Sequence, residues 1–155
     1  MGTRPLDDIK YVLQERMFEM LELQIADFDQ SISSIIESKM NETKSSAGDK
    51  FETGRAMMQL ELDKIESQLD QLKFTKNQLK QISPQLTNDQ VTLGSLVVSD
   101  IGNFYISVSL GKVGIDGQTY FTLSAEAPLS KVMIGKRIGE SVQMRNRAYK
   151  IIDIL

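Results

Sequence analysis

The sequence has no cysteine, no histidine and no tryptophan. Without cysteine and histidine, the chain cannot form disulfides, the usual zinc sites, cysteine nucleophiles or Ser-His-Asp triads. Any metal chemistry must use oxygen ligands, which suit Mg²⁺ or Mn²⁺. The lack of cysteine is also typical of the reducing cytoplasm, where we expect this protein to reside.

Long apolar runs and a strong excess of one charge are also missing. The first 16 residues contain no apolar core of a secretory signal, and no stretch approaches the roughly 18 apolar residues of a membrane span. We therefore expect no membrane association. The net charge is −3, which argues against broad binding of nucleic acid. Aromatic residues make up only 6% of the chain, which favours an elongated molecule with a thin core.

Composition changes at Ser83-Pro84. The chain before this point is rich in Glu, Gln, Leu, Met and Lys, whereas β-branched residues, aromatics and most glycines follow it. Proline disfavours helical backbone in the residue before it. We place a domain boundary within residues 82–88, which gives a helical domain at 1–83 and a β-rich domain at 84–155.

The helical domain contains two stripes of apolar residues at alternating spacings of three and four, the pattern of a coiled-coil seam. The first stripe is Phe18, Leu21, Ile25, Phe28, Ile32 and Ile35. The second is Met58, Leu62, Ile65, Leu69, Leu72, Lys76 and Leu79. Folding the chain back near residues 46–47 places each member of one stripe opposite a member of the other. We therefore predict an antiparallel coiled-coil hairpin about 45–50 Å long, in a monomer.

Five segments of the second domain are predicted to be strands, because β-branched and aromatic residues recur there between turn residues. They are Val91–Val98, Phe104–Leu110, Tyr120–Ala125, Ser141–Met144 and Tyr149–Ile154. Gly111, Gly114 and Gly117 are interpreted as a turn series. A short helix is expected within residues 128–139, ending at Gly135. The predicted fold class is α+β, with an antiparallel sheet.

Two acidic residues lie at the turn end of the hairpin. Asp49 and Glu52 are three residues apart, so on a helix both carboxylates can point the same way. Such a pair can share a hard cation that another macromolecule partly holds, although two ligands do not complete the octahedral shell of Mg²⁺. The same spacing is typical of a helix cap, in which Asp49 satisfies backbone N–H groups. Both interpretations remain open from spacing alone.

Two segments resemble the Gre-type transcript cleavage factors of bacterial RNA polymerase. Residues 48–52, Gly-Asp-Lys-Phe-Glu, are similar to the Gly-Asp-x-x-Glu tip of that family. Residues 127–142 share a proline, two glycines and two bases with the family segment Ser-Pro-Leu-Gly-x-Ala-Leu-Leu-Gly-Lys-Lys-x-Gly-Asp-x-Val. The second match is the more specific. With the predicted hairpin, the resemblance covers nearly the whole chain.

The resemblance implies a mechanism. Gre-type factors insert their coiled coil into the secondary channel of RNA polymerase, while an FKBP-like domain docks at the channel rim. The tip carboxylates, here Asp49 and Glu52, help to hold a Mg²⁺ ion shared with the polymerase active site. The polymerase core then cleaves its backtracked RNA by two-metal chemistry, so the factor is an accessory protein and no enzyme itself.

This chain departs from the family directly after Glu52. Residues 53–56 are Thr-Gly-Arg-Ala, where the family has Asn-Ala-Glu-Tyr. A channel-binding regulator that does not stimulate cleavage is therefore an alternative. An FKBP-like isomerase or chaperone and a purely structural coiled coil are further alternatives. Arg145, Arg147 and Lys150 form a basic group in the sequence, either a solvated strand edge or a surface that contacts RNA or polymerase.

Overall fold

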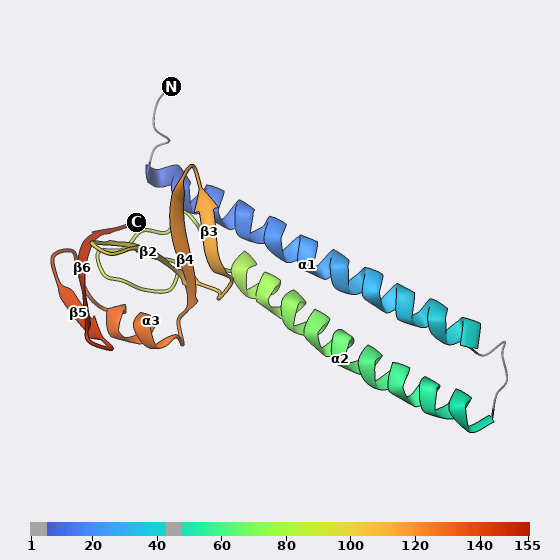
Figure 1. The fold of residues 1–155 in the computed structure, drawn as a ribbon. Coiled ribbons are helices and arrows are strands. Elements are labelled where there is room, and N and C mark those ends of the chain that lie inside the picture. Colours follow the sequence, from blue (N-terminus) through green and yellow to red (C-terminus); the bar gives the residue numbers. More distant parts are fainter. Residues whose placement is uncertain (1–5, 43–47) are drawn as a thin grey trace. The chain divides into compact units, whose positions relative to one another are not determined.

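The computed structural model describes residues 6–42 and 48–155, with side chains for 9–41 and 52–155. Two long helices come first, α1 (Leu6–Glu42) and α2 (Gly48–Lys80) (Figure 1). Six strands and a short helix, α3 (Pro128–Met133), follow. This order confirms the predicted α+β class, a helical hairpin ahead of a β-rich part. The turn expected at residues 46–47 lies outside the described residues.

The chain divides into two compact units. The hairpin unit is Glu19–Lys76, and the sheet unit is Met1–Phe18 with Asn77–Leu155. The predicted boundary at residues 82–88 marks the change from helix to strand, whereas these units divide within both long helices. The difference arises because the ends of α1 and α2 bury side chains with the sheet. The domain division at residues 1–83 and 84–155 stays a prediction.

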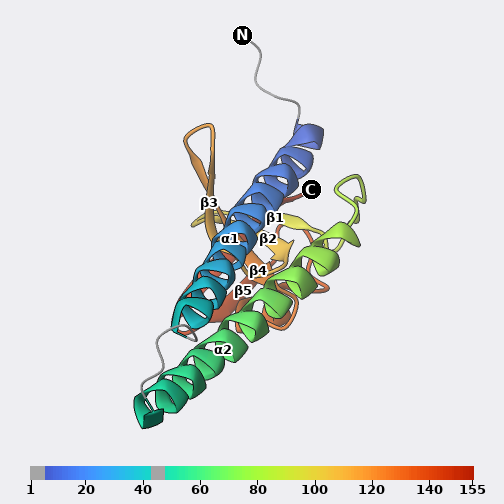
Figure 2. The same ribbon diagram turned by 90° about the vertical axis from the view of Figure 1, so that its right-hand side faces the viewer.

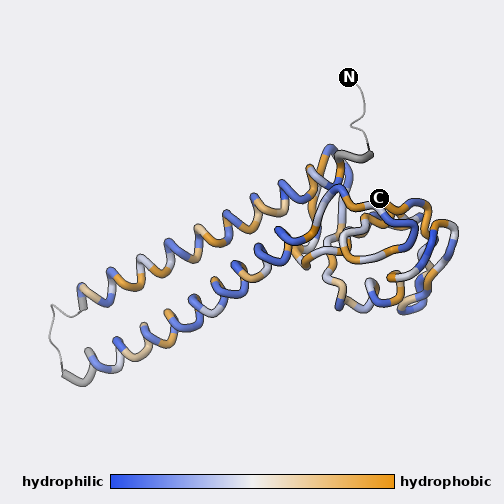
Figure 3. The backbone as a smooth tube through the Cα atoms, turned by 180° about the vertical axis from the view of Figure 1, so that it is seen from behind, coloured by the Kyte–Doolittle hydropathy of each residue, from blue (hydrophilic) through white to orange (hydrophobic). Residues whose placement is uncertain are grey.

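In the hairpin unit, α1 and α2 run alongside each other in opposite directions (Figures 1 and 2). Hydrophobic positions recur along both helices rather than in one block (Figure 3). The predicted stripe positions in this unit are buried or half-buried, and nearly all of their neighbours are exposed. These positions are Leu21, Ile25, Phe28, Ile32, Ile35, Met58, Leu62, Ile65, Leu69, Leu72 and Lys76. The seam inferred from the sequence is therefore confirmed.

Two polar contacts join the helices beside this seam. Lys76 forms an ion pair with Glu22, and Lys39 Nζ donates a hydrogen bond to Gln59 Oε1 at 2.7 Å. The step from Glu22 to Lys39 equals the step from Gln59 to Lys76, so both contacts report one register. The ion pair is partly exposed and contributes at most about 1 kcal/mol. The lysine therefore fits into the apolar seam by reaching a carboxylate at its edge.

The sheet unit contains six strands in the order β3-β4-β2-β1-β6-β5. Their bounds are β1 (Leu96–Ser99), β2 (Asn103–Ser107), β3 (Gly111–Ile115), β4 (Gln118–Ser124), β5 (Ser141–Met144) and β6 (Arg147–Ile154). The pairs are antiparallel except for β2 with β4, which are parallel. The predicted antiparallel sheet is therefore confirmed for the other four strand pairs, and the parallel pairing of β2 with β4 was not predicted. Strand β3 lies at the edge of the sheet, and β4, which follows it in the chain, lies between β3 and β2.

Strand β3 occupies residues that we interpreted as a turn series. Lys112 and Gly114 are exposed, whereas Val113 and Ile115 are buried, which is the alternation of a half-buried strand. The turn itself is the two-residue Asp116-Gly117 link, and both residues have positive φ, 50° and 81°. Asp-Gly is a strong hairpin signal. The turn interpretation is confirmed for Gly117 and was wrong for Gly111 and Gly114, because the glycines obscured the alternation between them.

Strand bounds also differ from the prediction at Val91–Val98. Only Leu96 onward is strand, because Gly94 adopts a φ of 92° and Ser95 N–H bonds back to the Thr92 carbonyl. This turn separates Val91 from β1. Strand β2 ends at Ser107, earlier than predicted, β4 and β6 each begin two residues earlier than predicted, and β5 has the predicted bounds.

The core of the sheet unit lies between the sheet and α3. It consists of Val91, Val97, Phe104, Ile106, Met133, Val142 and Ile151. Tyr105 points to the opposite face of β2, since successive strand residues alternate. The start of α1 meets that face, because Gln14 Nε2 donates to the Tyr105 hydroxyl at 2.8 Å. Strand β2 is thus buried on both faces.

Two polar side chains of α1 are buried at this junction. Gln14 Nε2 also donates to the Ile82 carbonyl at 2.7 Å, and Lys10 Nζ donates to the Leu86 carbonyl at 2.6 Å. Burial lowers the pKa of Lys10. Burial raises the pKa of Tyr105, and its hydrogen bond with Gln14 opposes that shift. One glutamine therefore ties α1 to both β2 and the segment that follows α2.

Replacing Gln14 with Met should lower the free energy of unfolding by about 1–3 kcal/mol, because the buried Ile82 carbonyl loses its donor. Urea unfolding measures this loss. In a double-mutant cycle with Tyr105→Phe, the two losses should not add, since both variants remove the same contact. Strict additivity would show that Gln14 and Tyr105 are not coupled.

Candidate functional site

The predicted carboxylate pair lies at the start of α2. The helical backbone begins at Gly48, so Asp49 is one residue inside the helix rather than ahead of it. The cap interpretation concerns the Asp49 side chain and stays a prediction, and an acid in the first turn also favours the positive end of the helix dipole. Glu52 follows three residues later on the same helix, and it is exposed. The Asp49 side chain lies outside the described side chains.

The donor set at this end of α2 is small. Among the described residues, no group of three or more Asp, Glu, His or Cys could hold a metal ion. The Asp49 carboxylate lies outside these described side chains, so the metal role of the pair stays a prediction. Carboxylate oxygens fit a hard cation such as Mg²⁺, but two side chains leave most of its six positions open. A site built on Asp49 and Glu52 therefore needs ligands from another molecule.

Residues 127–142 carry the more specific resemblance. Their backbone forms hydrogen bonds with two other parts of the sheet unit, at Val91 and at Ile151. Helix α3 begins at Pro128, and Gly135 follows its end with a φ of 90°. The Gly135 N–H bonds to the Val91 carbonyl, and Val91 N–H bonds back to the Lys136 carbonyl. The helix was predicted to end at Gly135, and it ends two residues earlier, at Met133. Gly135 is required there by backbone geometry, because residues with a Cβ rarely adopt that φ.

A second glycine in this segment has the same role. Gly139 has a φ of 92°, and its N–H bonds to the Ile151 carbonyl of β6. In return, Ile151 N–H bonds to the Glu140 carbonyl. The two glycines thus fasten the segment to Val91 on one side and to β6 on the other.

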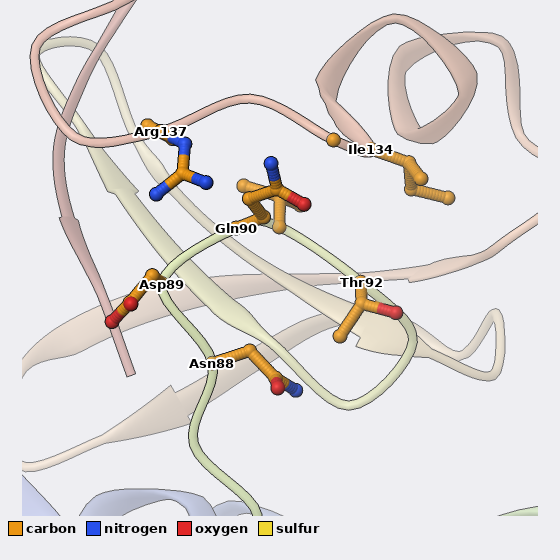
Figure 4. Close-up of a pocket in the computed structure, with 8 residues that line it drawn as sticks. Asn88, Asp89, Gln90, Thr92, Ile134 and Arg137 are labelled. Atoms are coloured by element: carbon orange, nitrogen blue, oxygen red, sulfur yellow. The ribbon is translucent and has the colours of Figure 1, made fainter.

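An open pocket of about 460 Å³ lies in the sheet unit, between residues 88–92 and 134–137. Figure 4 shows Asn88, Asp89, Gln90 and Thr92 on one wall, with Arg137 and Ile134 on the other. The walls are joined by a backbone bridge between Gln90 and Arg137. No ion pair between Asp89 and Arg137 occurs in the described structure, so acid and base remain separately available to a ligand. Sequence reasoning missed residues 88–92, which lie in a polar stretch without a motif.

The basic residues near the C-terminal end do not form one surface. Arg145 and Asn146 make the turn between β5 and β6, with positive φ values. Arg147 pairs with Met144, and Lys150 pairs with Ser141. Because Arg147 and Lys150 are an odd number of residues apart on β6, their side chains leave opposite faces of the strand. A single basic patch of these three residues is therefore not present.

The apolar runs of the described helices are too short and too often interrupted by charge for any of them to cross a bilayer.

Comparisons with known proteins add little to this geometry. No family model matches the chain, and no curated protein matches it. Among solved structures, GreA factor homolog 1 (Gfh1) of Thermus thermophilus aligns over 92% of this chain and 94% of its own. The sequence identity is 19% and the TM-score is 0.33. Likeness at this level carries no conclusion about fold or function.

Replacing Gly135 with Ala should lower the free energy of unfolding by about 1–2 kcal/mol, because a Cβ is strained at positive φ. Gly114→Ala is a matched control, since Gly114 lies in β3 without positive φ and has open space around its Cα. Chemical denaturation of both variants measures the difference. Equal losses would mean that the φ of Gly135 is not what selects glycine.

Proposed function

We propose that this protein binds RNA polymerase through its secondary channel and stimulates Mg²⁺-dependent cleavage of backtracked RNA. The observation that carries the proposal is the antiparallel pairing of α1 and α2, with Asp49 and Glu52 at the start of α2. The part of α1 within the hairpin unit is about 35 Å long at 1.5 Å per residue. A narrow hairpin of that length suits insertion into a channel. The resemblance of residues 48–52 and 127–142 to Gre-type factors supplies the identity of the channel.

In this proposal Asp49 and Glu52 act as ligands that the factor brings to an incomplete metal site. A Mg²⁺ ion bound there would supply Lewis-acid activation of water for phosphodiester hydrolysis. The carboxylates of this chain would orient that ion from one side, and the polymerase would provide the remaining ligands and the RNA. The protein is then an accessory factor, because hydrolysis takes place in the polymerase active site.

The sheet unit is proposed to dock at the rim of the channel. The pocket between residues 88–92 and 134–137 supports this role, since it combines an acid, Asp89, and a base, Arg137, with the exposed side chain of Ile134. Mixed polar walls around an exposed apolar residue are usual in protein interfaces. Arg137, which belongs to the segment at residues 127–142, lines this same pocket.

A second function is favoured by residues 53–56. Gly54 lies in the second turn of α2, where glycine weakens a helix, and Arg55 places a base where the family has an acid. A cation close to the metal ligands would oppose binding of Mg²⁺. A regulator that occupies the channel without stimulating cleavage is therefore the alternative.

Asp49→Asn and Glu52→Gln should each abolish stimulated RNA shortening in a backtracked complex and leave polymerase binding intact. Each change removes an ionised metal ligand, whereas an amide of the same shape remains. Glu37→Gln, an acid of α1 outside the pair, is the control and should retain full activity. Wild-type protein that binds polymerase without any cleavage would support the non-cleaving regulator. Full cleavage by both variants would remove the metal role.

Arg137→Glu should weaken binding to core RNA polymerase about tenfold, mainly through slower association, because it reverses a charge at the proposed docking pocket. Arg147→Glu makes the same charge change elsewhere in the sheet unit and should have little effect. Surface plasmon resonance at two salt concentrations measures both. If the two variants bind equally well, the pocket is not the docking surface.

A further inference from the structure

A groove in the hairpin unit is separate from the carboxylate pair and from the docking pocket. It has a volume of about 500 Å³ and lies between α1 and α2. Its floor contains the half-buried seam residues Ile35 and Ile65, and its α1 wall contains Ser31 and Ser34. Small wall residues allow the backbone of another helix to approach closely. The groove therefore has room for an apolar side chain at its base.

Charge along α1 determines what this groove can accept. Between Arg16 and Lys39, the helix has five acidic residues and no Lys or Arg: Glu19, Glu22, Asp27, Asp29 and Glu37. Asp27 lines the groove on the α1 side and Glu61 lines it on the α2 side. Within the described side chains, neither carboxylate has an ion pair. Nucleic acid and anionic lipid would be repelled here, whereas a basic polypeptide would be attracted.

We propose that this groove binds a basic amphipathic helix of a partner protein. An apolar side chain of the partner would rest on Ile35 and Ile65, and flanking Lys or Arg side chains would pair with Asp27 and Glu61. A helix is the occupant that fits, because a groove between two helices accepts the side-chain ridge of a third. This site is independent of RNA cleavage and does not require that the partner be RNA polymerase.

The test uses a fluorescein-labelled helical peptide of about 20 residues, with an Ala and Leu stripe flanked by lysines. Its counterpart has glutamates in place of the lysines. Fluorescence anisotropy should show binding of the lysine peptide alone to the full chain. The double variant Asp27→Asn with Glu61→Gln should bind it about tenfold more weakly, because two exposed ion pairs are lost.

The matched control is Glu37→Gln with Asp70→Asn, which removes the same charge from acids outside the groove. Its affinity should stay within about twofold of the wild type. Asp27→Lys with Glu61→Lys should reverse the preference and bind the glutamate peptide. The proposal is overturned if the wild type does not bind the lysine peptide, if both neutral double variants weaken equally, or if charge reversal does not switch the preference. Circular dichroism confirms that each variant keeps its helices.

Discussion

The packing of one apolar stripe of α1 against one stripe of α2 is the interaction on which the hairpin unit depends. Most seam residues are only half-buried, because a two-helix layer has no third element to cover it. The seam must therefore be continuous, and its one polar member, Lys76, is accommodated by the ion pair with Glu22. A register set in this way also fixes which residues stand at the turn end of the hairpin. The location of Asp49 and Glu52 is thus a consequence of packing many residues away.

A structural feature can be predicted from the sequence when neighbouring residues encode it, and it cannot when it depends on contacts between distant residues. The heptads could be predicted because α-helical periodicity is local. The region where α3 ends could be predicted because Gly135 has a positive φ, which favours glycine. Strand β3 was missed because Gly111 and Gly114 contribute no side chain to the alternation. The parallel pairing of β2 with β4 could not be predicted, since it depends on where β3 is laid in three dimensions. No local pattern predicts the hydrogen bond between Gln14 and Tyr105 either.

The candidate site likewise has parts that the sequence predicts and parts that it does not. The sequence names the carboxylates and predicts that both lie on one helix, and the backbone of both residues is helical in α2. The segment at residues 127–142 is different, since its two glycines are accounted for by backbone geometry at Gly135 and Gly139. That segment reports how the sheet unit is built rather than which chemistry it performs.

The negative charge of α1 determines which kinds of molecule the hairpin unit can contact. The long acidic stretch of α1 would be repelled by phosphate, so a hairpin working near RNA must be guided by protein surfaces. Two carboxylates are also too few to retain Mg²⁺ without help. Both limits lead to the same requirement, a partner that supplies basic side chains along the hairpin and the missing ligands at its end. In the function proposed above, that partner is RNA polymerase, and this chain would act as its accessory factor.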